Sequence, residues 1–125
     1  MLDTVALVTW WGDSPRLGAQ ARTTLERSSE AMFVSPVSVW EIANKNRLGK
    51  LPEFDGFGDE WTGLIRRDAF TLLQVSGDHA IRAGYLKGPH RDPFDRLIAA
   101  QALEEGLVVL TNDGEIAAFG CEVLW

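Results

Sequence analysis

The apolar run at residues 107–110, Leu-Val-Val-Leu, constrains the fold more than any other stretch of the chain. A short, continuous and β-branched run of this kind is typical of a strand that is covered on both faces, as strands in parallel sheets are. The segment before it carries helix signals at both ends, with Asp92 at the N-cap, Pro93 at the first helical position and Gly106 just past the last. A helix that leads directly into a buried strand predicts a parallel crossover unit.

The same alternation of apolar strands and helical segments extends over the whole chain. Strands are expected at residues 1–3, 32–34, 70–75, 107–110 and 122–125. Helices are expected at residues 5–11, 15–29, 36–48, 59–67, 76–86, 93–105 and 115–119, with a loop at 51–58. This order predicts an α/β fold, a three-layer α/β/α sandwich around a parallel sheet. We expect one domain that spans residues 1–125.

The composition argues against several classes of protein. No apolar run approaches the length of about 18 residues that a membrane helix needs, and the first residues lack the basic region and cleavage site of a signal peptide. The single cysteine, Cys121, cannot form an internal disulfide, which fits a reducing cytoplasm and excludes cysteine-based zinc sites. The net charge of −6 argues against a surface coated for nucleic-acid binding, although a net value can hide a local basic patch.

Asp95 stands out within the helix expected at residues 93–105. Ile98, Ala99 and Ala102 lie on one face of this helix, and counting back three or four residues from Ile98 and Ala99 leads to Asp95. The carboxylate therefore heads the apolar stripe instead of facing water. The simpler alternative is a first-turn acid that interacts favourably with the helix dipole.

Glu41 presents the same anomaly in the helix expected at residues 36–48. On a helical wheel, Val37, Trp40, Asn44 and Leu48 fall on one face, and Glu41 falls among them. A carboxylate in an apolar stripe is costly unless it is paired, hydrogen-bonded or bound to a metal. The alternative is a glutamate at the edge of the face, paired with the lysine four residues later.

Together, four acids occupy comparable places in the expected fold. Asp3 ends the first strand, Glu41 lies on the helix after the second, Asp95 begins the helix before the fourth, and Asp113 follows the fourth. A parallel sheet brings its strand ends to one edge, where sites are usually built. One like-charged pair at 4 Å costs about 4 kcal/mol at an effective dielectric of 20, and a hard divalent cation removes that cost. The pattern therefore predicts metal-assisted phosphoryl chemistry.

At this point the sequence resembles the PIN domain family, and in particular the VapC-type toxins of bacterial toxin–antitoxin pairs. The matching segments are LDTVALVTWW at 2–11, VSVWEIANKNRLGKL at 37–51, HRDPFDRLIAAQALEEGLVVLTND at 90–113 and the FG turn at 119–120. They cover nearly the whole chain and consist of several spaced motifs.

The resemblance implies a parallel sheet of order 3-2-1-4-5, a homodimer and an Mg²⁺- or Mn²⁺-dependent endoribonuclease. It assigns metal binding and catalysis to Asp3, Glu41 and Asp95, with Asp113 as the fourth acid and Thr111 as a supporting hydroxyl. It also implies a cognate antitoxin that wraps the toxin and fills the acidic pocket, and an RNA substrate for which tRNA is the commonest target in the family. A metal-activated water would leave 5′-phosphate and 3′-hydroxyl ends.

Several nearby residues have candidate roles around these acids. Asp92 is most simply an N-cap, with a supporting role at the site as the alternative, and His90 is most simply a turn residue. Five cations follow Glu41 or flank Asp95 and could form the basic rim that an RNA phosphate chain needs, although each alone is more often a solvated surface charge: Lys45, Arg47, Lys50, Arg91 and Arg96.

The chain departs from the family pattern at two places. Only Met1 and Leu2 precede Asp3, whereas relatives usually have several more apolar residues in this strand. The second residue after Asp3 is commonly His or Asn in relatives and is Val5 here. The first departure means that the start of the chain is misplaced or trimmed, or that the first strand is frail.

Two other functions remain open from the sequence. A receiver-like signalling domain would be similar in length and class, but it needs a second acid next to Asp3 and a lysine after the last strand, and neither is present. A catalytically inactive PIN-like scaffold would act through partner binding alone, and the presence of all four acids argues against it.

Overall fold

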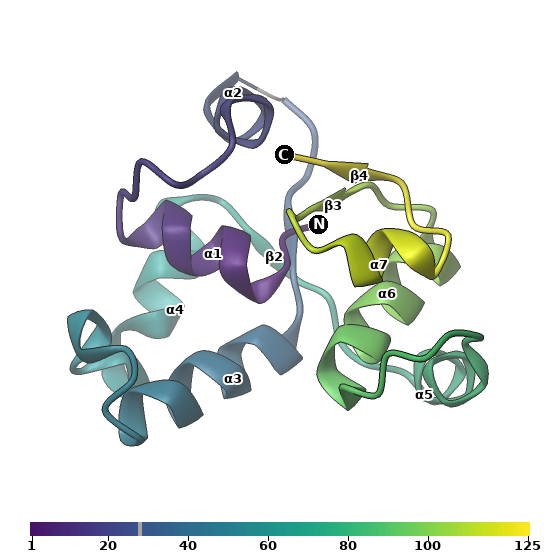
Figure 1. Cartoon of the computed structure of the whole chain (residues 1–125). Coiled ribbons are helices and arrows are strands. Elements are labelled where there is room, and N and C mark those ends of the chain that lie inside the picture. Colours follow the sequence, from purple (N-terminus) through teal and green to yellow (C-terminus); the bar gives the residue numbers. More distant parts are fainter. Residues whose placement is uncertain (28) are drawn as a thin grey trace.

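Among the described residues, the fold is a parallel sheet of four very short strands, joined by a central segment at Leu2, between two layers of helices (Figure 1). The structure is a computed structural model and describes residues 1–27 and 29–125. Strands β1 (Phe33–Val34) and β2 (Thr71–Leu72) pair in parallel, as do β3 (Val109–Leu110) and β4 (Val123–Leu124).

Leu2 joins the two pairs of strands into one sheet. It forms parallel bridges to Val34 on one side and to Leu110 on the other. The backbone N–H of Leu2 donates to the Phe33 carbonyl at 2.9 Å, and the N–H of Leu110 donates to the Met1 carbonyl at 2.8 Å. The spatial order is therefore β2, β1, the Leu2 segment, β3, β4, which confirms the predicted order 3-2-1-4-5. The first strand is short, but it occupies the centre of the sheet and is bonded on both sides.

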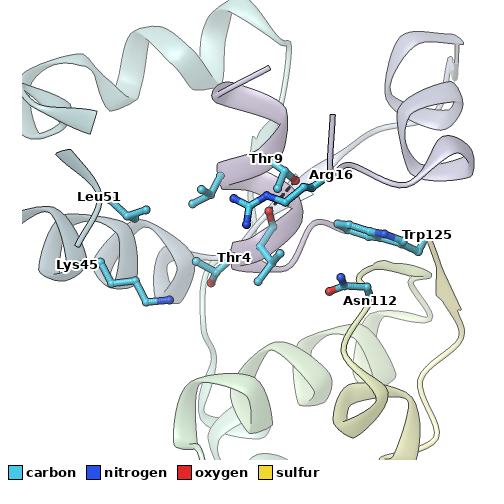
Figure 2. Close-up of a pocket in the computed structure, with 9 residues that line it drawn as sticks. Thr4, Thr9, Arg16, Lys45, Leu51, Asn112 and Trp125 are labelled. Carbon is cyan, nitrogen blue, oxygen red and sulfur yellow. Dashed lines mark hydrogen bonds between the residues drawn. The ribbon is translucent and has the colours of Figure 1, made fainter. Parts of the chain in front are cut away.

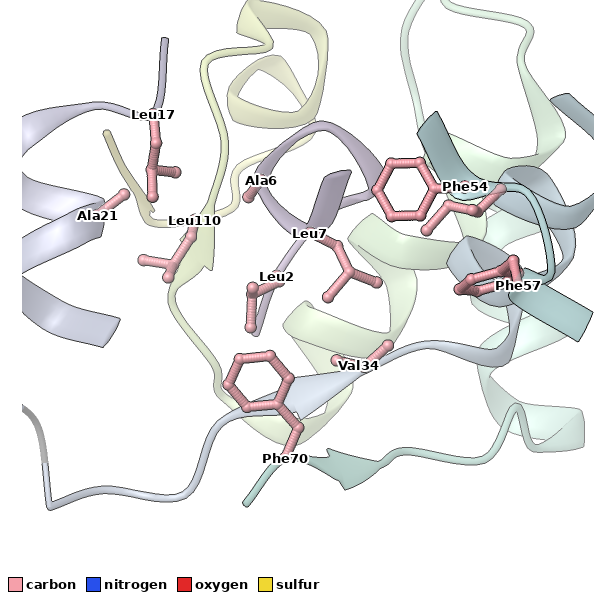
Figure 3. Close-up of a cluster of buried hydrophobic side chains, with 11 residues drawn as sticks. Leu2, Ala6, Leu7, Leu17, Ala21, Val34, Phe54, Phe57, Phe70 and Leu110 are labelled. Carbon is pink, nitrogen blue, oxygen red and sulfur yellow. The ribbon is translucent and has the colours of Figure 1, made fainter. Parts of the chain in front are cut away.

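Each face of the sheet is covered by its own hydrophobic cluster, because side chains alternate along a strand. Leu2, Val34 and Leu110 point to the cluster drawn in Figure 3, which is closed by α1 (Thr4–Trp11), α2 (Ala19–Arg27) and α4 (Phe57–Arg67). The opposite face packs against α6 (Pro93–Glu105) and α7 (Gly114–Ala118), with α5 (Gly77–Tyr85) against α6. The three layers of the predicted sandwich are confirmed.

The remaining helices are α3 (Pro36–Arg47), which contributes Val37 to one cluster and Ile42 to the other, and the short 3-10 helix η1 (Pro52–Phe54). Among the described residues, no helix has the length and apolar character needed to span a membrane.

The predicted helix ends agree with the caps that the structure shows. The Asp92 carboxylate accepts from the Phe94 N–H at 2.8 Å, and Gly106 closes α6 in the left-handed region at φ 64°. The Ser35 hydroxyl caps α3 in the same way, accepting from the Val37 N–H at 3.1 Å.

Other boundaries differ from the sequence prediction. The second helix begins at Ala19 instead of residue 15 and ends at Arg27, and the predicted extension reaches Ser28, which lies outside the described residues. The expected loop at 51–58 contains η1 and the first turn of α4. All strands are shorter than predicted; β3, for example, keeps only Val109 and Leu110 of the expected run at 107–110.

Candidate active site

Asp3 lies at the carboxyl end of the central strand and is 4% exposed. Its side chain caps α1: Oδ1 accepts from the Ala6 N–H at 2.6 Å, while Oδ2 accepts from the Thr111 hydroxyl at 2.5 Å. The pKa of Asp3 is raised to about 6, mainly by burial; the two hydrogen bonds lower it, and the nearby charges of Asp95 and Asp113 raise it. The carboxylate is therefore held rigidly in a place that disfavours its charge.

The loop after β3 brings Thr111 and Asp113 to the same edge of the sheet. Thr111 is 2% exposed, and its Oγ1 both donates to Asp3 and accepts from the Asp113 N–H at 2.9 Å. Asp113 in turn caps α7, accepting from the Glu115 N–H at 2.8 Å. A single hydroxyl thus links the loop that carries Asp113 to the buried Asp3.

Asp95 lies in the first turn of α6, where its side chain is 27% exposed. Burial raises its pKa, and the charges of Asp92 and Asp113 add to this effect, whereas the His90 hydrogen bond and charge lower it. His90 Nε2 lies 2.8 Å from Asp95 Oδ2. The hydrogen bond to Asp95 is the main reason that the pKa of His90 is raised.

Sequence reasoning treated His90 as a turn residue and missed this contact. His90 belongs to the loop before α6 and lies five residues from Asp95. No helical or strand period relates two such positions, so the contact depends on how the loop folds back onto the helix. The only signal available was a histidine next to an acidic helix start.

Glu41 lies on α3, but the apolar face predicted for this helix was wrong. The buried residues are Val37, Ser38 and Ile42, whereas Trp40 is 51% exposed and Leu48 is 50% exposed. The Glu41 side chain is 20% exposed, and its Oε1 forms an ion pair with Lys45 Nζ at 2.5 Å. The pairing that the sequence left as the alternative is therefore present.

Two contacts hold α3 beside the other acids. The Thr4 hydroxyl, next to Asp3, donates to the Ser38 hydroxyl at 3.0 Å. The Trp40 ring lies 4.6 Å from the Phe94 ring, centroid to centroid, and these residues directly precede Glu41 and Asp95. Glu41 thus occupies the rim of the acidic site, with its charge directed at Lys45.

The donor set fits a hard divalent cation in chemistry. The charges of neighbouring acids, Asp113 among them, raise the pKa values of Asp3 and Asp95. Every candidate ligand is a carboxylate oxygen, the type that Mg²⁺ and Mn²⁺ prefer. Within residues 1–27 and 29–125, however, no three acidic, histidine or cysteine side chains stand close enough to hold a metal ion as they are. In the structure, Glu41 is paired with Lys45 and Asp95 with His90.

The basic residues expected at the rim have different surroundings. Arg47 is exposed and donates to Asn44 Oδ1 at 2.8 Å, and Lys50 and Arg91 are also exposed. Arg96 donates to the carbonyls of Ala83, Gly84, Leu86 and His90, and it lies over the Phe119 ring at 5.2 Å. Its N–H donors hold the end of α5 and the loop that carries His90. RNA binding by Arg96 stays a prediction, and these hydrogen bonds argue against it.

A pocket of about 240 Å³ opens beside the acids (Figure 2). Thr4, Lys45 and Asn112 line it, and each neighbours one of the acids in sequence or by ion pairing. Arg16 and Trp125 form much of the remaining wall, together with four less polar residues: Val5, Val8, Thr9 and Leu51.

The chain is similar to a known protein family and to solved structures. A model of the PIN domain matches residues 1–120. The structure of VapBC2 from Rickettsia felis, bound to a DNA fragment from its promoter, is similar with a TM-score of 0.72 and 17% identity, covering 99% of this chain and 96% of that chain. DNA-bound VapBC from Salmonella typhimurium is similar with a TM-score of 0.70 and 25% identity, covering 99% of this chain and 95% of that chain. A search among curated proteins gave no match.

Proposed function

Because this chain belongs to the PIN domain family, we propose that it is a metal-dependent endoribonuclease, the toxin of a toxin–antitoxin pair. The observation that carries the proposal is the buried Asp3, whose pKa is raised to about 6 by burial and by the charges of Asp95 and Asp113. Acids arranged so that they repel one another at a strand edge are expected where a divalent cation binds. A purely structural role would not favour this arrangement.

In this proposal Asp3, Glu41, Asp95 and Asp113 hold Mg²⁺ or Mn²⁺. A bound cation would neutralise the carboxylates and the RNA phosphate and would lower the pKa of a water for in-line attack. The chain's own contribution is positioning: Thr111 fixes one oxygen of Asp3, and the Ala6 N–H fixes the other. Asp113 orients the nucleophile, and Asp92 supports the start of α6 as its N-cap.

We propose tRNA as the substrate class and the cytoplasm as the place of action. Lys45, Arg47, Lys50 and Arg91 supply the basic rim for the phosphate chain, since each lies on or after α3 or in the loop before α6. The cytoplasmic assignment is supported by the single, buried Cys121.

We also propose a homodimer and a cognate antitoxin as partners. The two similar structures, from Rickettsia felis and Salmonella typhimurium, are DNA-bound VapBC assemblies, and this supports the proposed antitoxin. The apolar side chains Ile81 and Tyr85 on α5 are 63% and 85% exposed, and Trp40 on α3 is 51% exposed. Such surfaces favour association with a second protein chain.

The decisive experiment is incubation of the purified, antitoxin-free protein with total RNA, with and without Mg²⁺ or Mn²⁺. We expect metal-dependent cleavage that leaves 5′-phosphate and 3′-hydroxyl ends, and no cleavage by Asp3→Asn. Products with 2′,3′-cyclic phosphate, or cleavage that persists in EDTA, would contradict the mechanism.

A further inference from the structure

We propose that the pocket of Figure 2 is a subsite for one nucleotide of the RNA strand, with a phosphate bound to Arg16 and Lys45 and a base stacked on Trp125. This inference rests on the proposed ribonuclease function and assigns the path of the strand next to the acids.

The first support is the state of Arg16. Its backbone N–H donates to the Ser14 hydroxyl oxygen at 3.2 Å, but within the described part of the chain its guanidinium makes no ion pair or hydrogen bond. Figure 2 shows the Arg16 side chain reaching between Trp125 on one side and Lys45 and Leu51 on the other. A guanidinium that faces a pocket with its donors unused is suited to the geometry of a phosphate.

The second support is the charge beside it. Lys45 lines the same pocket, and among the described residues its ion-pair partner is Glu41, an acid of the candidate metal site. The Lys45 ammonium has three donors, so it can bind a phosphate while it stays beside Glu41. In a chain of net charge −6, two cations on one pocket wall are a local exception that fits an anion.

The third support is the way Trp125 is held. A Cβ placed on Gly18 would come within 2.5 Å of Trp125 Cδ1 and 2.6 Å of Cγ, so the segment before α2 packs directly against the indole. This contact fixes the ring while leaving it in the pocket wall next to Asn112 (Figure 2). A fixed aromatic face beside cations is the usual platform for an unpaired base.

The size and position of the pocket agree with a single nucleotide unit. Its volume of about 240 Å³ lies below the range of roughly 300–1,000 Å³ in which drug-sized ligands are enclosed. The exposed Val5, with 44% of its surface accessible, and Leu51 give the apolar part of the wall. Thr4 and Asn112 place the pocket one residue away from Asp3 and Asp113, so a nucleotide here would adjoin the scissile one.

The test uses the whole protein in EDTA, where no cleavage occurs, and follows amide and indole N–H signals by NMR during titration with adenosine 5′-monophosphate. We expect the Trp125 indole signal and the Arg16 and Asn112 amide signals to shift together. Ribose 5-phosphate should shift the signals around Arg16 without the Trp125 indole, because it lacks a base. Arg16→Ala should weaken binding about tenfold, whereas Arg27→Ala, the same charge change at an exposed position of α2, should leave it unchanged.

Gly18→Ala provides a second variant that keeps every charge and displaces Trp125, and it should weaken the monophosphate but not ribose 5-phosphate. The proposal would be overturned if Arg16→Ala and Arg27→Ala bound the monophosphate equally, or if the signal shifts were confined to other surfaces. It would also be overturned if a short poly-glutamate peptide bound the same residues more strongly, which would assign the pocket to an acidic protein partner. Because the titration needs no cleavage, its failure leaves the ribonuclease test intact, and loss of cleavage leaves the titration readable.

Discussion

At the scale of single residues, the site stores unfavourable electrostatic energy in Asp3. Its folded-state pKa of about 6 lies above the ordinary value of 3.8, so the folded protein binds a proton more readily than the unfolded chain. The contribution of Asp3 to the stability of the metal-free protein therefore falls as pH rises from about 4 to about 6 and stays low above this range. A shift of about two pKa units corresponds to roughly 3 kcal/mol.

Asp3→Asn should accordingly raise the melting temperature of the metal-free protein at pH 7. The amide keeps an acceptor for the Ala6 N–H and removes the buried charge. The advantage over the wild type should shrink as the pH is lowered from 7 to 4, because the wild-type carboxyl becomes neutral there. Calorimetry in EDTA across this pH range measures both effects, and a gap that is constant with pH would show that the charge is not the cause.

Asp95 distinguishes a site residue from a simple first-turn acid. If it repels Asp113 and Asp3, Asp95→Asn should stabilise the metal-free protein by roughly 1 kcal/mol, reduced by the weaker bond to His90. If it only complements the helix dipole, the change should destabilise by roughly 0.3–1 kcal/mol. The sign of the melting shift in EDTA separates the two readings.

At the scale of elements, Asp68 ties α1 to the end of α4. Its Oδ2 accepts from the Trp10 indole at 3.0 Å and from the Trp11 indole at 2.9 Å. Burial alone would raise the pKa of Asp68, but the bonds from Arg67 and from the two indoles lower it below its ordinary value. The stabilisation is therefore present above pH 3.8, the ordinary pKa, and is lost as the pH falls below it.

Asp68→Ala should destabilise the protein by roughly 1–3 kcal/mol, because it leaves two half-buried indole donors without their acceptor. Asp55→Ala is the matched control, since Asp55 is exposed and follows η1. Urea denaturation at pH 7 measures the difference, and equal midpoints for the two variants would contradict it.

Two glycines in different elements should respond to alanine with opposite signs. Gly63 lies exposed inside α4 with open space around it, so Gly63→Ala should stabilise the protein by about 1 kcal/mol through helix propensity. Gly18→Ala meets the Trp125 backbone at 2.3 Å and should destabilise it. Thermal melts of both variants test this, and a stabilising Gly18→Ala would mean that Trp125 moves freely.

The elements also show how far the sequence determined the result. Helix starts at Asp92 and Ser35 follow from local capping chemistry, and the strand order follows from the family resemblance, so both were predicted correctly. The prediction of the buried face of α3 was wrong because Trp40 packs against Phe94. This contact joins segments distant in sequence, and a helical wheel describes one helix alone. The bond between His90 and Asp95 was missed for the same reason.

At the scale of the whole molecule, metal should act as a stabilising ligand. A cation that binds only the folded state at 100 times its dissociation constant adds about 2.7 kcal/mol, so Mg²⁺ should raise the melting temperature of the wild type. Asp95→Asn should gain clearly less, and Asp92→Asn, which keeps an N-cap next to the site, should gain nearly as much as the wild type. Equal gains for all three proteins would place the metal away from Asp95.

The central position of Leu2 in the sheet also determines how late during translation the acidic site can assemble. Leu2 needs Val34 on one side and Leu110 on the other, and Asp3 meets its hydroxyl partner Thr111 across 108 positions of sequence. Contacts of such long range form late and slowly, because the loop between them must close first. A ribosome that has translated two thirds of this chain carries Asp3 and Glu41 but no assembled acidic edge. The nascent chain therefore has no complete site until its last strands have emerged.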